Sequence, residues 1–264
     1  MLINAGVTAR DRSFKRGNPG SLAGADEIIM AKKLKPSGNP NIVKLWPTTM
    51  LTKRFAHYQK VNPALLELFY QHQQREQRGA QKSYASKDDL LSQYPLHKEL
   101  NELAEFISQG IVEVAREANA DLWQGSEKVS VNITGLWFQI SNNHAFHEMH
   151  VHGNCSWSGV YYVRAADCST SPASNSGERP NGVTRFYGPH VEHMAGGFGD
   201  YGNLYLHDNH WDSFPEDGKL CIFPSHIKHM PFPYSGEEDR VIVSFHAQVF
   251  NSSGSQSYNY GFSN

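Results

Sequence analysis

The chain has 264 residues, 39% of them hydrophobic and 19% charged, with a formal net charge of −2 at pH 7. This length suffices for one large domain with a buried core, and the near-neutral charge provides no basic surface for a nucleic-acid backbone or an anionic membrane. No apolar run approaches the roughly 18 residues of a membrane span, and the N-terminal segment lacks the apolar stretch of a signal peptide, so we expect a cytoplasmic protein.

The first part of the chain predicts an irregular arm followed by two helices. Residues 1–44 are rich in Gly, Lys, Arg and Pro and show no sustained periodicity. Residues 61–74, VNPALLELFYQHQQ, place Asn62 as a helix cap and Pro63 in the first turn. A second helix is predicted from about residue 96, because apolar residues recur there at helical spacing. These residues, expected to pack into the core, are Leu100, Leu103, Ala104, Ile107, Ile111 and Val114.

From residue 129 the pattern changes to β-branched and aromatic runs broken by Gly, Pro and Asn. The predicted strands are VSVNITGLWFQIS (129–141), SWSGVYYVRA (156–165), VTRFYG (183–188), KLCIFP (219–224) and RVIVSFHAQVF (240–250). Short strands without intervening helices favour a mainly β fold, a sandwich or a jelly roll, with the helices on its N-terminal side. Residues 167–181 and 194–217 read as long loops that could cover the mouth of such a barrel.

Histidine, not cysteine, is the residue type that points to a metal site. The 14 histidines cluster at 144–152, 190–193, 207–210 and 226–229. The three cysteines, Cys155, Cys168 and Cys221, are odd in number and irregularly spaced. This spacing argues against a disulfide framework and against a cysteine-rich zinc site.

The motif HEMHVH at residues 147–152 predicts two metal ligands on an extended segment. A zincin helix is excluded, because its second histidine lies four residues after the first and here it lies three after. In an extended chain, alternate side chains share a face, so His150 and His152 point with Glu148 to one side and His147 points to the other. The alternative is a surface strand that carries ordinary histidines.

A second motif, near the C-terminal end of the predicted core, supplies a further ligand and a cation. In HMPFPYSGEEDR, Arg240 opens an apolar strand 11 residues after His229. A non-haem iron site that uses a dicarboxylate co-substrate needs such a pair, because the histidine completes the metal ligands and the guanidinium forks onto a carboxylate. Alone, Arg240 could equally be a plain surface charge.

The stretches HVHGNCSWSGVYYV and FPSHIKHMPFPYSGEEDRVIVSF resemble the 2-oxoglutarate and iron(II)-dependent oxygenases. The resemblance covers about residues 45–250, including an opening strand at LWPTTM (45–50) and the second helix. It implies a double-stranded β-helix, or jelly roll of cupin-like type, flanked by helices. We therefore expect one oxygenase domain at 45–264, with helical support at 60–120, a jelly-roll core at about 129–250 and a C-terminal tail at 251–264.

The resemblance also implies roles for individual residues. His150, His152 and His229 would bind iron(II), with His152 in the place where most relatives have Asp or Glu. Arg240 would pair with the distal carboxylate of 2-oxoglutarate. Tyr162 matches a tyrosine that contacts the same carboxylate, although it could simply be a core aromatic residue, and Ser244 is a further expected co-substrate contact. Glu148 could be a missing acidic ligand or an acceptor that orients His150.

The predicted function is hydroxylation of a small molecule or peptide side chain, with dioxygen consumed and 2-oxoglutarate decarboxylated to succinate. Neither nucleic acid nor a membrane is expected as a partner. Two alternatives stay open. A cupin-like three-histidine dioxygenase would need no 2-oxoglutarate, although Ser156 and Trp157 hold the places of the cupin glutamate. A non-catalytic β-sandwich could bind a metal or a sugar, with Trp157 and Trp211 as stacking surfaces.

Overall fold

The computed structural model describes residues 48–76, 83–120, 123, 128–171, 180–188 and 210–251. The predicted arm, the predicted tail beyond residue 251 and most of the two predicted loops lie outside these ranges. The chain divides after Pro47, and the second unit, Thr48–Asn264, contains every described residue. None of the helices described is both long and apolar enough to span a membrane.

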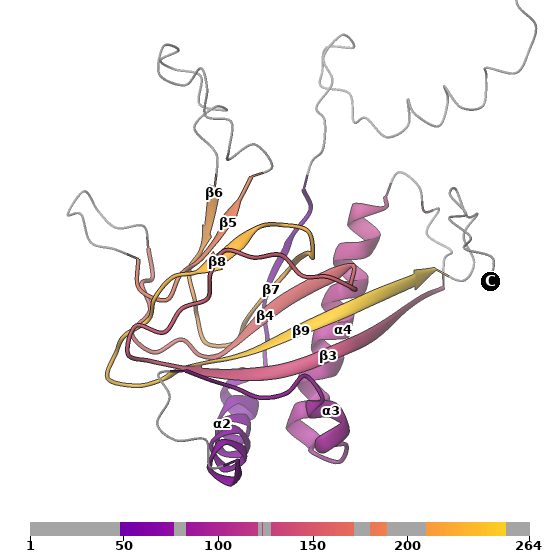
Figure 1. The fold of residues 1–264 in the computed structure, drawn as a ribbon. Coiled ribbons are helices and arrows are strands. Elements are labelled where there is room, and N and C mark those ends of the chain that lie inside the picture. Colours follow the sequence, from indigo (N-terminus) through magenta and orange to yellow (C-terminus); the bar gives the residue numbers. More distant parts are fainter. Residues whose placement is uncertain are drawn as a thin grey trace, which may run out of the picture. The chain divides into compact units, whose positions relative to one another are not determined.

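The strands of the described residues form two antiparallel sheets (Figure 1). The larger sheet has six strands, in the order β1 (Leu51–Arg54), β7 (Lys219–Pro224), β4 (Trp157–Arg164), β9 (Arg240–Asn251), β3 (Val129–Ser141) and β2 (Ser83–Ala85). The smaller sheet has three strands, in the order β6 (His210–Ser213), β5 (Thr184–Tyr187) and β8 (His229–Pro231). The prediction of a mainly antiparallel β architecture is confirmed, and each of the five predicted strand segments contains a strand.

The opening strand predicted at residues 45–50 is described only in part. Residues 45–47 lie outside the described residues, residues 48–50 have no regular structure, and strand β1 follows at Leu51–Arg54. Leu51 is buried and pairs with Ile222 of β7. Strand β1 therefore begins at a residue whose apolar side chain packs into the core.

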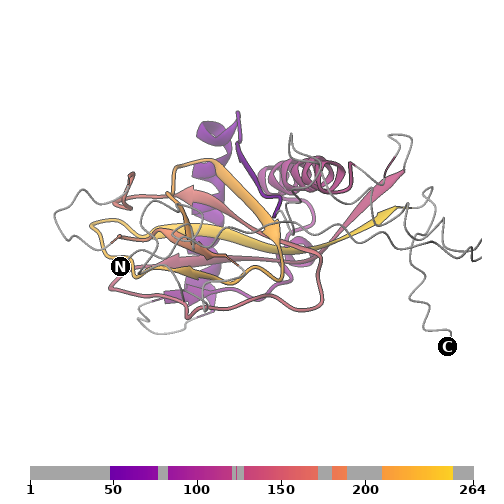
Figure 2. The same ribbon diagram turned by 90° about the horizontal axis from the view of Figure 1, so that it is seen from above.

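Among the described residues, three helices precede the long strands: α2 (Tyr58–Arg75), α3 (Leu90–Gln93) and α4 (Lys98–Ala118). Figures 1 and 2 show α2 and α4 on one side of the larger sheet. The predicted apolar stripe of α4 is buried against it, since Leu100, Leu103, Ile107 and Ile111 are 0% exposed. The second helix is therefore confirmed, and so is its core face except at Ala104, which is only partly buried. The His97 side chain caps it by accepting a hydrogen bond from the Leu100 amide.

The predicted start of the first helix is wrong. Helix α2 begins at Tyr58, so Pro63 lies inside it and Asn62 is not its cap. Asn62 is buried, donates to the carbonyl of Val163 and accepts from the hydroxyl of Tyr161, at 2.7 Å each. Its polar side chain thus joins the helix to β4 instead of satisfying the helix end.

The two faces of the larger sheet differ in composition. Along β9, Val241, Val243 and Phe245 are 0% exposed and belong to the core under the helices. Opposite them, the alternate residues from Arg240 to His246 line a cavity. A strand reverses face at each residue, so one strand serves both the core and the cavity.

Candidate active site

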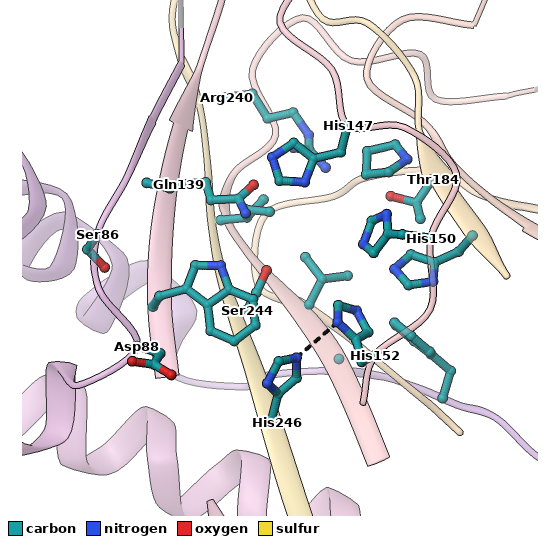
Figure 3. Close-up of a pocket in the computed structure, with 18 residues that line it drawn as sticks. Ser86, Asp88, Gln139, His147, His150, His152, Thr184, Arg240, Ser244 and His246 are labelled. Carbon is teal, nitrogen blue, oxygen red and sulfur yellow. Dashed lines mark hydrogen bonds between the residues drawn. The ribbon is translucent and has the colours of Figure 1, made fainter. Parts of the chain in front are cut away.

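A cavity of about 440 Å³ lies between the larger and the smaller sheet. Arg240 and Ser244 line it from β9, Thr184 from β5 and His229 from β8. Five histidines contribute to its wall, namely His147, His150, His152, His229 and His246. Figure 3 shows the imidazoles and the guanidinium turned towards one space.

The structure brings together the three histidines that the sequence predicts as metal ligands. One nitrogen each of His150, His152 and His229 lies within 4.8 Å of the other two. Their ring centroids are 4.3 Å apart for His150 and His229, and 5.0 Å for each of the other pairs. His150 and His229 also exchange two backbone hydrogen bonds, of 3.0 and 3.1 Å, which hold the distant motifs side by side.

Backbone carbonyls fix the tautomers of two of these rings. His150 Nδ1 lies 2.7 Å from the Glu148 carbonyl, and His229 Nδ1 lies 3.0 Å from the Ile227 carbonyl. A carbonyl oxygen can only accept, so each Nδ1 carries the proton and each Nε2 offers its lone pair. Glu148 thus orients His150 through its backbone, whereas its side chain is exposed and lies outside the three-histidine cluster.

Two histidines of the cluster, His152 and His229, are held in the neutral form at neutral pH. Burial, reinforced by neighbouring imidazoles of which His229 is the strongest, lowers the pKa of His152 to about 3. Burial also lowers the pKa of His229 to about 4. Neutral imidazole is the form that binds a metal ion, so little proton release would accompany binding at neutral pH.

The prediction that His147 points away from the three clustered histidines is wrong. Between residues 145 and 152 the chain forms only single β-bridges, at Ala145 and at His150, so side chains do not alternate regularly. His147 lines the same cavity, with its ring centroid 5.9 Å from that of His150. Burial, followed by the charges of His150 and Arg240, lowers its pKa.

Arg240 is a buried cation with unused hydrogen-bonding capacity. It is 4% exposed, and its Nε and Nη2 have no hydrogen-bond partner among the described residues. Its guanidinium carbon lies 5.3 Å from the centre of the Tyr162 ring. An unsatisfied buried donor costs about 1–3 kcal/mol, and more when it is charged. A carboxylate in the cavity would satisfy both nitrogens with fork geometry.

The two other predicted co-substrate contacts lie in different places. Ser244 lines the cavity, on the same face of β9 as Arg240. Tyr162 is 0% exposed and does not line the cavity. Its hydroxyl lies 3.1 Å from Oγ1 of Thr184, which does line the cavity. Tyr162 therefore contacts Arg240 and Thr184 on their side away from the cavity.

The donor set fits a divalent transition metal with a carboxylate ligand. Three neutral imidazoles suit iron, zinc or copper and leave coordination positions free. If one end of such a ligand binds the metal, a carboxylate at its other end can accept hydrogen bonds from Nε and Nη2 of Arg240.

Sequence reasoning missed several lining residues, of which His246 is the most informative. His246 Nε2 lies 2.9 Å from Nδ1 of His152 (Figure 3). It could have been found from alternation, because Arg240, Ser244 and His246 follow one face of a single strand. Other missed lining residues are Ser86, Asp88, Trp137, Gln139 and Thr184.

Two of the histidine clusters in the sequence, at 190–193 and 207–210, are described only in part. His190, His193 and His207 lie outside the described residues. His210 and Trp211 lie on β6 and do not line the cavity.

The model of a known family matches the central part of the chain. Residues 135–246 match the family described as "Putative 2OG-Fe(II) oxygenase". This range contains both quoted motifs and the three clustered histidines. The match confirms the predicted resemblance, and it agrees with the predicted enzyme class and with iron(II) and 2-oxoglutarate as its cofactor and co-substrate. No curated protein matches the chain.

Several solved structures are similar at low sequence identity. A prolyl-4-hydroxylase from Pseudomonas putida is 14% identical, with a TM-score of 0.43 over 75% of this chain and 92% of that chain. HygX from Streptomyces hygroscopicus, with nickel and 2-oxoglutarate bound, is 13% identical, with a TM-score of 0.47 over 80% and 84%. The epimerase SnoN from nogalamycin biosynthesis is 12% identical, with a TM-score of 0.47 over 76% of each chain.

Proposed function

We propose that the chain, which matches the 2-oxoglutarate and iron(II) oxygenase family over residues 135–246, is an oxygenase that hydroxylates a small molecule or a peptide side chain. The observation that carries the proposal is the buried guanidinium of Arg240, whose Nε and Nη2 have no hydrogen-bond partner among the described residues, in the same cavity as the three clustered imidazoles. 2-Oxoglutarate has a carboxylate at each end, so one end can bind a metal while the other pairs with the guanidinium.

We assign the architecture to the double-stranded β-helix, or jelly roll. Its support is a pair of antiparallel sheets that enclose the cavity, with the helices packed on the outer face of the larger sheet. We further propose that residues 45–264 act as one oxygenase domain, since both sheets contribute to one site.

His150, His152 and His229 would hold the metal ion, each through Nε2. Three neutral ligands leave the ion's charge of two uncompensated, unlike a site with a carboxylate ligand. 2-Oxoglutarate brings two negative charges, so its binding lowers the combined charge of the ion and Arg240 from +3 to +1. A cluster that contains no carboxylate among the described residues is thus consistent with an anionic co-substrate.

When bound, iron(II) and 2-oxoglutarate would supply the oxidising chemistry that consumes dioxygen, releases carbon dioxide and succinate, and hydroxylates a substrate C–H bond. Arg240 would anchor the distal carboxylate, and Tyr162 would keep the guanidinium in place by packing against it. Apolar parts of the cavity wall lie between the polar groups and would exclude water; they are formed by Val160, Phe223 and Ile242.

We place the primary substrate at the end of the cavity that contains Ser86 and Asp88. Figure 3 shows these two residues on the side away from Thr184. The Trp137 ring and the Gln139 amide also line the cavity. A flat apolar surface beside a carboxylate, an amide and a hydroxyl suits a small polar substrate.

The test is an anaerobic titration of 2-oxoglutarate into the iron(II)-loaded protein. We expect a visible charge-transfer absorption, because the co-substrate would bind iron directly. Replacing Arg240→Met removes two charge-assisted hydrogen bonds, each worth about 1.5–3 kcal/mol, so the dissociation constant should rise by roughly 10²-fold or more. The Arg240→Lys variant keeps the charge but not the fork, and an intermediate effect is expected.

Arg164→Met is the matched control. Arg164 ends β4 outside the cavity and bonds Tyr70 and the Asp239 carbonyl, so its loss should leave 2-oxoglutarate affinity unchanged. Iron-dependent succinate release that is unaffected in Arg240→Met would contradict the anchor. An iron-loaded protein that consumes dioxygen without 2-oxoglutarate would favour the cupin-like alternative.

A further inference from the structure

We infer that His246 is a positioning residue that fixes the tautomer of His152 and so determines whether all three imidazoles can bind the metal. The inference rests on the proposed metal site and concerns a residue beyond its ligands. His246 lies on β9, and its Nε2 is 2.9 Å from Nδ1 of His152 (Figure 3). No other ligand of the cluster contacts a second histidine in this way among the described hydrogen bonds.

The strand and a neighbouring indole hold His246 in place. In the β9 ladders it is opposite Ser158 on β4 and Gly135 on β3, so its backbone is fixed on both sides. The Trp137 ring packs edge-on against its imidazole, with centroids 4.7 Å apart and an interplanar angle of 66°. The rings of His246 and His152 meet at 4.6 Å and 61°. The contact is therefore part of a packed sheet face.

The proton between the two rings can lie on either nitrogen. For His152 to bind a metal through Nε2, its Nδ1 must carry the proton and donate to Nε2 of His246. If instead His246 Nε2 carries the proton and donates, neutral His152 holds its own proton on Nε2 and that nitrogen cannot bind. Carbonyl acceptors exclude the second arrangement for His150 and His229. His152 is thus the ligand whose availability depends on a second side chain.

The contact with His246 should change how strongly His152 binds a metal ion. His152 is the ligand that takes the place of an acidic residue in the family pattern. An acceptor at Nδ1 raises the electron density at Nε2 and makes the imidazole a stronger donor, and loss of such an outer partner typically weakens metal binding by about 10- to 100-fold. His246 would therefore contribute affinity without touching the ion. An apolar replacement should lose this contribution, whereas an amide that can accept a hydrogen bond should keep part of it.

The test uses cobalt(II) as the probe, since its visible spectrum reports coordination independently of turnover. In His246→Phe we expect the dissociation constant for cobalt(II) to rise by roughly 10- to 100-fold, with an altered spectrum. In His246→Gln the side-chain oxygen can accept from His152, so affinity should recover to within several-fold of the original protein. The melting temperature of each metal-free variant shows whether the fold is retained.

Gln248→Phe is the matched control, because Gln248 lies two residues further along the same face of β9 but outside the cavity. Its cobalt(II) affinity should not change. A folded His246→Phe protein with the original affinity and spectrum would overturn the role, as would a folded His246→Gln protein that binds as weakly as His246→Phe. If the original protein and its variants follow the expected order but succinate is never formed, the oxygenase proposal fails and the role of His246 stands.

Discussion

The two faces of the six-stranded sheet are built from the same strands but follow different rules. Towards the helices, Val243 and Phe245 are 0% exposed and pack in one apolar core. Towards the cavity, Ser244 and His246 alternate with them and present polar groups. Adjacent residues of β9 therefore have different roles, because one packs in the core and the next lines the cavity.

The difference also appears in the energetics. Each large apolar side chain on the helix face contributes about 1.5–3 kcal/mol through burial, and volume matters more than identity. On the cavity face, Arg240 is buried with two nitrogens that have no partner among the described residues, which lowers stability, and a bound anion would remove this cost. Burial of apolar side chains on the helix face thus offsets the loss of stability caused by polar groups and empty volume on the cavity face.

The largest expected effect comes from removing a proposed ligand. His229→Ala should abolish iron-dependent succinate formation, a greater loss than the roughly 10- to 100-fold expected for an outer partner. The fold should persist, because the site is on the cavity face. Metal content, succinate yield and melting temperature are the measurements. His226→Ala is the control, since His226 is exposed in the turn between β7 and β8 and lies outside the cavity. Full activity without His229 would remove the basis for the three-histidine site.

The next effect contrasts two neighbours on β3. Phe138 is 0% exposed and stacks on Phe69 with centroids 4.2 Å apart, whereas Gln139 lines the cavity. Phe138→Ala should cost about 3–5 kcal/mol of unfolding free energy, while Gln139→Ala should cost less than about 1 kcal/mol. Denaturant unfolding of the metal-free proteins measures both values. Equal losses would mean that the two faces are not energetically distinct.

A smaller effect is expected at two glycines that differ in their surroundings. An added Cβ at Gly159 would lie 2.3 Å from the Phe245 ring and 2.6 Å from the Cys221 carbonyl, whereas at Gly153 it would meet nothing within 4 Å. Gly159→Ala should therefore destabilise the protein by about 1–3 kcal/mol. Gly153→Ala should be neutral or stabilising by less than about 1 kcal/mol. A tolerated Gly159→Ala would show that the centre of the sheet can move to admit a methyl group.

Much of the β architecture could be predicted because strand signals are local. The predicted segments 129–141 and 219–224 coincide with β3 and β7, and the run at 240–250 covers β9 except for its last residue. The start of α2 could not be predicted, because the partners of Asn62 on β4 lie 99 and 101 residues further along the chain. A polar residue beside a proline resembles a helix cap until those partners are known.

The candidate site was predicted where residue type and spacing both carried information. His150, His152, His229 and Arg240 lie in two short motifs, and the structure places all four at one cavity. His147 was placed on the wrong side, because the segment before His150 forms single bridges and is not a continuous strand. The role of His246 depends on a contact across 94 residues of chain, which spacing alone does not show.

A further expected effect is a pH dependence of stability that originates on the cavity face. The pKa of His152 is lowered from 6.5 to about 3 and that of His229 to about 4, with burial as the main cause. Below about pH 6.5 the unfolded chain takes up protons that the native metal-free protein excludes, so stability should fall as the pH decreases towards about 4. Above about pH 6.5 these groups are neutral in both states and contribute no slope. Melting temperatures of the metal-free protein measure this, and the double variant His152→Asn, His229→Asn should show a shallower decline. An unchanged slope in that variant would place the acid sensitivity elsewhere in the molecule.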